Sequence, residues 1–300
     1  MPRVPWAYAT TGDPATWGSV EAVLLGPQRA ESGRLDPRAL PRLKFVQTLF
    51  TGLDGVPLEY FPDSVAVAGN VGAYAPFVAE HAMALALAAA RHIVVAQAQV
   101  AAGRLRPAPD HRLLLERTAV ILGYGAIGRA LSERLAGFHT HVIGVNRTGR
   151  AAPGAERMLP ASELRTAIAL GDLVFDVRPL TRSTRATIGT AELDAMKPGA
   201  ILVLVGRAGT VDEEALYRHL VAHPEFRAGI DVWWHEGFET GVLTNRFPFA
   251  SLPNVIATPH TAGFGPGVPS YVLEIALENL ARYFRGERPR HIADRSEYGP

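Results

Sequence analysis

The sequence has 300 residues, 48% hydrophobic and 20% charged, which is enough apolar material for about two globular domains and excludes a disordered or fibrous chain. A net charge of +1, with no run of like charges, argues against a nucleic acid as the main partner. The absence of cysteine excludes disulfides, zinc–thiolate sites, iron–sulfur centres and thiol nucleophiles, and no metal site is expected. The N-terminal segment lacks the apolar core of a secretory signal, and the longest apolar run, residues 82–90, is too short to cross a bilayer. We therefore expect a cytoplasmic protein without a membrane partner.

The first quarter of the chain predicts a small α/β domain. Short strand-like segments lie at residues 20–26, 44–50 and 65–70, and Pro- and Gly-rich connections separate them. An Ala-rich stretch over residues 75–102 then predicts a long helix.

Strand-like and helix-like segments alternate from residue 118 onward. Short β-branched or apolar runs occupy residues 118–123, 141–145, 172–177, 200–205, 227–232 and 254–259, with helix-capable sequence between most of them. Uninterrupted apolar strands at this spacing indicate a parallel sheet covered on both faces. Residues 269–285 carry apolar side chains at helical spacing directly after the last strand, so we expect the chain to return to the first domain.

A glycine-rich motif follows the first strand of this alternating region. Gly123, Gly125 and Gly128 form the pattern Gly-x-Gly-x-x-Gly, with Ala126 and Ile127 between the second and third glycines, before a helix-forming segment. The first glycine permits a tight turn, the second lets a pyrophosphate approach the backbone, and the third lets helix and strand pack closely. This context favours dinucleotide binding over a plain turn.

The residues at the end of the next strand indicate which dinucleotide, NAD(H) or NADP(H), the protein prefers. Asn146 stands 18 residues after Gly128, where an NAD site usually has a carboxylate that bonds the ribose and repels a 2′-phosphate. Arg147, Thr148 and Arg150 follow, and they could hold that phosphate through charge-assisted hydrogen bonds. The sequence thus favours NADP(H) over NAD(H), the alternative being solvated loop arginines and an enzyme that accepts either cofactor.

Over most of residues 42–285 the chain resembles the D-isomer-specific 2-hydroxyacid dehydrogenases, which include glyoxylate/hydroxypyruvate reductases and phosphoglycerate dehydrogenases. The resemblance rests on segments in the family's order: LKFVQTLFTGLDGV, VAVAGN, VAEHAMALALAAAR, GYGAIG, RPLTRSTRATIG, MKPGAILVLVGRAGTVDEEAL, AGIDVWW and LPNVIATPHTAG. It implies an α/β fold with two domains, a doubly wound Rossmann-type sheet at residues 92–268 and a smaller flavodoxin-like substrate domain from residues 1–91 and 269–300. By analogy with the family, a homodimer is expected.

The resemblance also implies a catalytic group of three residues. Arg207 matches the arginine that binds the substrate carboxylate and polarises its carbonyl, His260 the general acid and base, and Glu236 the carboxylate that orients this histidine. The chemistry agrees, because reduction of a 2-oxo acid needs a cation for the carboxylate and a proton donor for the forming alkoxide. A neighbouring carboxylate favours the imidazolium and would keep the proton available near neutral pH.

Further roles are implied by the resemblance alone. The loop that holds the substrate carboxylate through backbone N–H groups matches Thr51, Gly52 and Leu53. Positions that line the cofactor match Pro179, Thr184, Val205 and Asp231, of which the Val205 carbonyl and Asp231 would lie near the nicotinamide amide.

Three departures from the family pattern leave the substrate open. Leu204 and Val205 replace the usual Asn-Thr before the arginine, and Trp233-Trp234-His235 is bulkier than the usual sequence. The first domain is also shorter than usual, so one strand–helix unit is expected to be missing or abbreviated.

The sequence thus predicts an NADP(H)-preferring 2-oxoacid reductase for a small substrate such as glyoxylate or hydroxypyruvate. A formate enzyme on this scaffold is disfavoured, because related formate dehydrogenases carry Gln where this chain has Glu236. A phosphite-type dehydrogenase stays open, as does a dinucleotide-sensing binding protein or co-repressor that keeps the same three residues. His219 and His223 are four residues apart on a predicted surface helix and lack the Glu of a zinc-protease motif.

Overall fold

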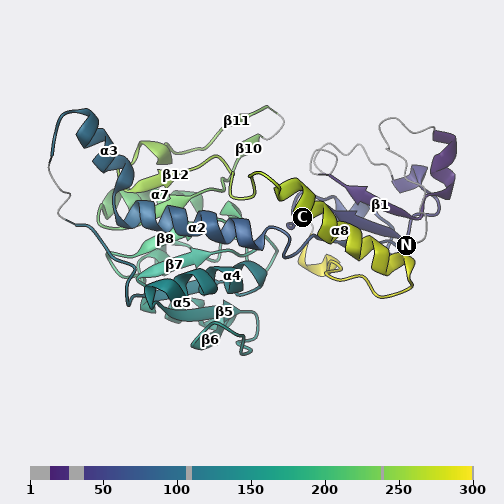
Figure 1. The fold of residues 1–300 in the computed structure, drawn as a ribbon, viewed down its shortest axis with the longest axis horizontal. Helices are drawn as coiled ribbons and strands as arrows, with labels where there is room; N and C mark the ends of the chain where they lie inside the picture. Colours follow the sequence, from purple (N-terminus) through teal and green to yellow (C-terminus); the bar gives the residue numbers. More distant parts are fainter. Residues whose placement is uncertain (1–13, 27–36, 106–109, 238–239, 299–300) are drawn as a thin grey trace. The chain divides into compact units, whose positions relative to one another are not determined.

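The computed structural model describes residues 14–26, 37–105, 110–237 and 240–298 (Figure 1). It divides into two compact units: unit 1 comprises residues 1–73 and 269–300, and unit 2 comprises residues 74–268. The structure therefore draws the first boundary at residue 73 instead of the predicted residue 91. The reason is that helix α2 (Ala75–Ala90) buries its apolar side chains against the sheet and helices of unit 2.

A seven-stranded, fully parallel sheet forms the centre of unit 2. In spatial order its strands are β12 (Val255–Ala257), β9 (Arg227–Ile230), β8 (Ile201–Leu204), β7 (Leu173–Asp176), β4 (Thr118–Leu122), β5 (His141–Asn146) and β6 (Arg157–Pro160). This is the doubly wound arrangement, extended by β12, and the chain reverses its direction of winding between β4 and β7. All six strands predicted from residue 118 onward are present, whereas β6 was not predicted.

Helices cover both faces of this sheet (Figure 1). Successive residues of a strand point to opposite faces, so Ala119 and Ile121 join one apolar cluster while Val120 and Leu122 join the other. The first cluster packs under α2 and α4 (Ala126–Leu135). The second packs under α5 (Leu164–Leu170), α6 (Thr190–Leu193) and α7 (Glu213–Ala222). This two-sided burial is why the strands read as continuous apolar runs.

The Ala-rich stretch forms two helices instead of one. His92 adopts a left-handed conformation with φ 49°, which ends α2 and precedes α3 (Ile93–Ala101). Among the described residues no single helix meets the length and hydropathy expected of a membrane span, and α2 with α3 does so only as a pair bent by 55°.

A buried arginine fixes the C-terminal end of α2. The side chain of Arg227, on β9, is 1% exposed and donates hydrogen bonds to the carbonyls of Ala89 and Ala90, at 2.9 and 3.0 Å. Carbonyls in the last turn of a helix lack the i+4 partners of the helix interior and carry the negative end of the helix dipole, so a guanidinium is a suitable cap.

Unit 1 contains a three-stranded parallel sheet and a long helix. The strands are β1 (Ala22–Leu25), β2 (Phe45–Thr48) and β3 (Ala66–Ala68), in that order, and the helix is α8 (Val268–Phe284). Leu280 packs against Phe45 and Ala68, and Asn279 donates to Gln47 Oε1 at 2.6 Å. The chain thus returns to this unit after the last strand of unit 2. Much of the segment expected to be abbreviated, residues 1–13 and 27–36, lies outside the described residues.

Candidate active site

Each of the three motif glycines at the end of β4 has a different environment. Gly123 has φ 87°, and a Cβ there would lie 2.9 Å from Arg178 Cγ. A Cβ on Gly128 would lie 3.2 Å from Ile121, so this glycine lets α4 approach the strand. A Cβ on Gly125 would meet only Gly123 O, at 3.8 Å, so the backbone here is open on one side.

This turn can hold a pyrophosphate. Helix α4 begins at Ala126, and its first turn receives no hydrogen bond from a capping side chain. The first N–H groups of a helix lack intrahelical partners and attract anions. With the open backbone of Gly125, these groups fit the phosphates of a dinucleotide at the topological switch point of the sheet.

Asn146 organises the loop that follows β5. Its Oδ1 accepts a hydrogen bond from the N–H of Thr148 at 3.1 Å, and its Nδ2 donates to the carbonyl of Arg150 at 2.9 Å. Gly149 completes the turn with φ 70°. Arg147 and Thr148 are exposed on this loop. An uncharged side chain therefore closes a loop rich in hydrogen-bond donors.

The other positions expected to line the cofactor lie at neighbouring strand ends. After β7, the hydroxyl of Thr184 donates to the carbonyl of Pro179 at 2.7 Å and so closes a turn. After β8, Val205 is buried, and its N–H donates to the carbonyl of Asp176. The side chains of Leu204 and Val205 belong to the two apolar clusters on opposite faces of the sheet. This departure from the family pattern therefore extends the cores of unit 2.

Asp231, directly after β9, is fully buried and accepts hydrogen bonds from four groups. Its Oδ1 accepts from Thr258 Oγ1 at 2.6 Å and Thr261 N at 2.9 Å, and its Oδ2 from Ala262 N at 3.0 Å. His81 Nε2, on α2, lies 3.3 Å from Oδ1. Burial alone would raise the pKa of Asp231, but these hydrogen bonds outweigh burial and hold the pKa below its usual value. The carboxylate thereby fixes the loop after β12.

His260 lies on that loop and contacts Glu236. His260 has φ 53°, and its N–H donates to the carbonyl of Asp231 at 2.8 Å. Its Nδ1 is 2.8 Å from Glu236 Oε1. The same oxygen accepts the N–H of Trp233 at 2.7 Å, so the carboxylate is held from both sides. The imidazole is 24% exposed, which leaves it accessible for proton exchange.

Aromatic side chains hold the segment that carries Glu236. Trp234 stacks on Phe249 with ring centroids 5.3 Å apart and donates from Nε1 to the carbonyl of Val211. Trp233 donates from Nε1 to the carbonyl of Thr258 at 2.9 Å. Glu236 then begins the short hairpin of β10 (Glu236–Gly237) and β11 (Val242–Leu243), seen in Figure 1. The bulky Trp-Trp pair is thus structural support for the carboxylate.

Arg207 lies in the loop after β8, three residues beyond the strand end. It is partly buried, and its Nη1 donates to the carbonyl of Gly206 at 2.9 Å. Strands β8, β9 and β12 are neighbours in the sheet, so Arg207, Asp231 and His260 follow the carboxyl ends of three adjacent parallel strands. Open α/β sheets bind their ligands at this edge.

The predicted substrate loop belongs to unit 1. Thr51, Gly52 and Leu53 follow β2, and Gly52 and Leu53 are buried. The hydroxyl of Thr51 donates to the carbonyl of Asn70 at 3.1 Å. This packing fixes the loop within its own unit.

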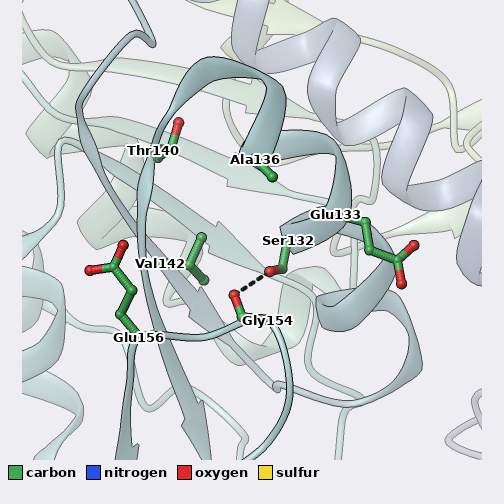
Figure 2. Close-up of a pocket in the computed structure, with 7 residues that line it drawn as sticks. All are labelled: Ser132, Glu133, Ala136, Thr140, Val142, Gly154 and Glu156. Atoms are coloured by element: carbon green, nitrogen blue, oxygen red, sulfur yellow. Dashed lines mark hydrogen bonds between the residues drawn. The ribbon is translucent and has the colours of Figure 1, made fainter.

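A hollow of about 350 Å³ lies elsewhere on unit 2, between the end of α4 and the start of β5 (Figure 2). Ser132 donates across it to the carbonyl of Gly154, and its lining includes Glu133 and Glu156. These carboxylates would repel a phosphate, and the hollow is at the amino end of β5. It is therefore distinct from the dinucleotide site.

His219, on α7, and His223, directly after this helix, lie close to carboxylates. His219 Nδ1 lies 3.3 Å from Asp194 Oδ1, and His223 Nδ1 lies 3.5 Å from Glu225 Oε1. Burial, and then the neighbouring His223, hold the pKa of His219 below its usual value despite these carboxylates.

The sequence reasoning missed four polar residues that support the site: His81, Asp176, Arg178 and Thr210. Three of them carry a signal in the sequence, because Asp176 and Arg178 are charges at the end of an apolar strand and His81 lies within an apolar helix, whereas nothing marks Thr210. Charged groups in such positions need buried partners.

Asp231 provides a test of this support. An Asn at this position would turn an amide donor toward one of the backbone N–H groups, so we expect Asp231→Asn to lower the free energy of unfolding by about 2 kcal/mol at neutral pH. A carboxyl with a lowered pKa stabilises above its unfolded-state pKa and loses this effect as the pH falls through the folded-state value. The difference in Tm between wild type and variant should therefore shrink on acidification below the usual range of aspartate. The exposed Asp63→Asn is the control, and a difference independent of pH would contradict the interpretation.

The comparisons with known proteins agree with this architecture. Residues 83–262 match the family model of the D-isomer specific 2-hydroxyacid dehydrogenase, NAD binding domain. A hydroxypyruvate reductase from Thermotoga maritima is 35% identical over 247 residues, which span 81% of this chain and 77% of that protein. A glyoxylate reductase from Thermococcus litoralis is 30% identical over 266 residues, which span 85% of this chain and 78% of that protein.

Among solved structures, a D-isomer specific 2-hydroxyacid dehydrogenase from Xanthobacter autotrophicus Py2, in complex with NADPH and MES, matches with a TM-score of 0.78. It is 26% identical, and the match covers 94% of this chain and 85% of that chain. The match to the family model, the two relatives and the glycine turn at the switch point lead to one conclusion. The chain belongs to the D-isomer-specific 2-hydroxyacid dehydrogenases and is an oxidoreductase that uses a nicotinamide dinucleotide.

Proposed function

We propose that this enzyme reduces a small 2-oxo acid, such as glyoxylate or hydroxypyruvate, with NADPH as the preferred cofactor. The observation that carries the proposal is the 2.8 Å contact between His260 Nδ1 and Glu236 Oε1, at the sheet edge that also bears Arg207. The substrate class is supported by the relatives named hydroxypyruvate reductase and glyoxylate reductase.

The proposed reaction adds one hydride to the carbonyl carbon and one proton to its oxygen. The reduced nicotinamide, when bound, supplies the hydride. Arg207 binds the substrate carboxylate through its planar, permanently charged guanidinium and polarises the carbonyl. Glu236 accepts the Nδ1–H of His260, which leaves the Nε2–H to donate its proton to the carbonyl oxygen. The imidazole then regains a proton from solvent.

In the same proposal, the loop Thr51–Leu53 binds the substrate carboxylate through its backbone N–H groups. Pro179, Thr184, the Val205 carbonyl and Asp231 keep their proposed places beside the cofactor. The hydrogen bonds to Asp231 add a second role for this residue, which is to hold the loop of His260.

The loop after β5 supports the proposed preference for NADPH. Asn146 places no negative charge there, and the exposed Arg147, Thr148 and Arg150 bring hydrogen-bond donors to the same loop. A 2′-phosphate would gain charge-assisted hydrogen bonds from such donors.

We also propose a homodimer, with α3 in the interface. Helix α3 has no buried residue, and Ile93, Val94 and Val100 are each more than half exposed. Exposed apolar side chains gathered on one helix are typical of a contact surface, and a second copy of the chain is the partner that closes a symmetric pair.

The catalytic roles are tested by turnover of glyoxylate and hydroxypyruvate with NADPH. We expect His260→Ala to lower kcat about 10²- to 10⁴-fold, because general acid catalysis is lost. Glu236→Gln should lower it less, because the amide can still orient the ring. His141→Ala is a matched control, since His141 also contacts a glutamate but lies at the exposed amino end of β5. Undiminished turnover in His260→Ala would exclude the role proposed for this residue.

The cofactor preference is tested by comparing kcat/KM for NADPH and NADH. Asn146→Asp retains the acceptor for Thr148 but introduces a charge that repels a 2′-phosphate. We expect the NADPH/NADH ratio of kcat/KM to fall at least about tenfold. A wild-type enzyme that prefers NADH would contradict the proposal directly.

The oligomeric state is tested by light scattering after size-exclusion chromatography. The wild type should have the mass of a dimer, and Val94→Asp should shift it toward the monomer, because a charge would be buried without a partner. The control is Val242→Asp on the exposed β11. A monomeric wild type would refute the dimer.

A further inference from the structure

A buried ion pair lies at the end of β7. Asp176 is 0% exposed and Arg178 is 8% exposed. Arg178 binds the carboxylate through two nitrogens, with Nε 2.9 Å from Oδ1 and Nη2 2.6 Å from Oδ2. Its Nη1 donates to Thr187 Oγ1 at 2.8 Å. The pair is a bidentate, charge-assisted contact.

This pair adjoins the two turns that form the proposed site. A Cβ on Gly123, in the dinucleotide turn, would lie 2.9 Å from Arg178 Cγ. A Cβ on Gly206, next to Arg207, would lie 2.4 Å from the carbonyl oxygen of Arg178. Both turns therefore pack closely against Arg178, Gly123 against its side chain and backbone and Gly206 against its backbone.

Asp176 also holds both ends of the loop that carries Arg207. Its backbone carbonyl accepts the N–H groups of Val205 and Gly206, at 3.2 and 3.0 Å. Its carboxylate Oδ2 is 2.9 Å from the hydroxyl of Thr210. That hydroxyl is also 2.9 Å from the carbonyl oxygen of Arg207. Arg207 is thus the middle residue of a loop fastened at each end to one aspartate.

We propose that Asp176, Arg178 and Thr210 form a positioning unit that sets the backbone of Arg207, and with it the direction of the guanidinium that receives the substrate carboxylate. This inference rests on the proposed function of Arg207. In this proposal all three residues act through Arg207 and are therefore positioning residues.

A purely stabilising role would account less well for these residues. Burying two charges costs solvation that their attraction offsets only in good geometry, and apolar residues of similar volume commonly stabilise a core as well or better. An apolar core would fill the space but would provide no directional bond to the loop. The ion pair gives the Thr210 hydroxyl a fixed, charged acceptor.

Thr210→Val is the sharpest test, because Val keeps the shape of the buried side chain and leaves the Asp176–Arg178 contact intact. We expect KM for glyoxylate to rise about tenfold, as for the loss of one buried hydrogen bond, with kcat changed less than about threefold. The dissociation constant of NADPH, followed by its fluorescence, should not change. Thr210→Ser, which restores the hydroxyl, should return KM to the wild-type value.

Thr140→Val is the matched control. Thr140 is also buried, and its hydroxyl also bonds a backbone carbonyl, that of Leu114, at 3.3 Å. It lies at the amino end of β5, so the same loss of a hydroxyl should leave KM unchanged. Equal effects of the two variants on KM would indicate general destabilisation and overturn the inference.

A double-mutant cycle separates the inference from the function on which it rests. If Thr210 acts through Arg207, Thr210→Val should cause no further loss of kcat/KM in an Arg207→Ala background. Additive losses would overturn the inference, as would a normal KM in Thr210→Val. A normal kcat/KM in Arg207→Ala alone would instead refute the proposed role of Arg207.

Discussion

The hydrogen bonds to the buried carboxylate of Asp231 are the interaction on which the geometry of the candidate site depends. This residue follows β9 and draws the loop after β12 toward that strand through Thr258, Thr261 and Ala262. His81 brings α2 to the same point. A carboxylate in a low-dielectric interior is stable only with such a set of donors, and the donors in turn fix the segments that carry them. The left-handed backbone of His260 persists because the residues on both sides of it are held.

Two different kinds of packing then place the partners of His260. Glu236 is positioned by an aromatic cluster, in which Trp234 stacks on Phe249 and Trp233 bonds the carbonyl of Thr258. Arg207 is positioned by polar contacts at the end of β7. At this edge of the sheet, aromatic packing therefore positions Glu236, and the contacts of a buried ion pair position Arg207. Both sets of contacts fix short loops at strand ends, where the proposed chemistry takes place.

Much of the fold could be predicted because unit 2 buries its strands on both faces. Continuous apolar runs marked β4, β5, β7, β8, β9 and β12, and the glycine pattern marked the turn before α4. Strand β6 was not predicted because it lies at the sheet edge with little buried surface, and its sequence therefore contains no continuous apolar run. The break between α2 and α3 depends on a left-handed histidine within helix-forming sequence, and no proline or glycine marks it. The sequence marks Asp176, Arg178 and His81 as charged groups in apolar segments, but it does not show which groups they bind, because partners such as Thr210 and Asp231 lie far away along the chain.

The Asp176–Arg178 contact also bears on how this sequence can change over generations. A single substitution at either position leaves the other charge buried without its partner, which costs more than either the ionic pair or an apolar pair in the same space. A lineage that replaces this pair with two apolar residues must therefore pass through a single variant in which one charge is buried without its partner and the fold is destabilised. We expect the two positions to be inherited together within a lineage, as a joint marker of common descent.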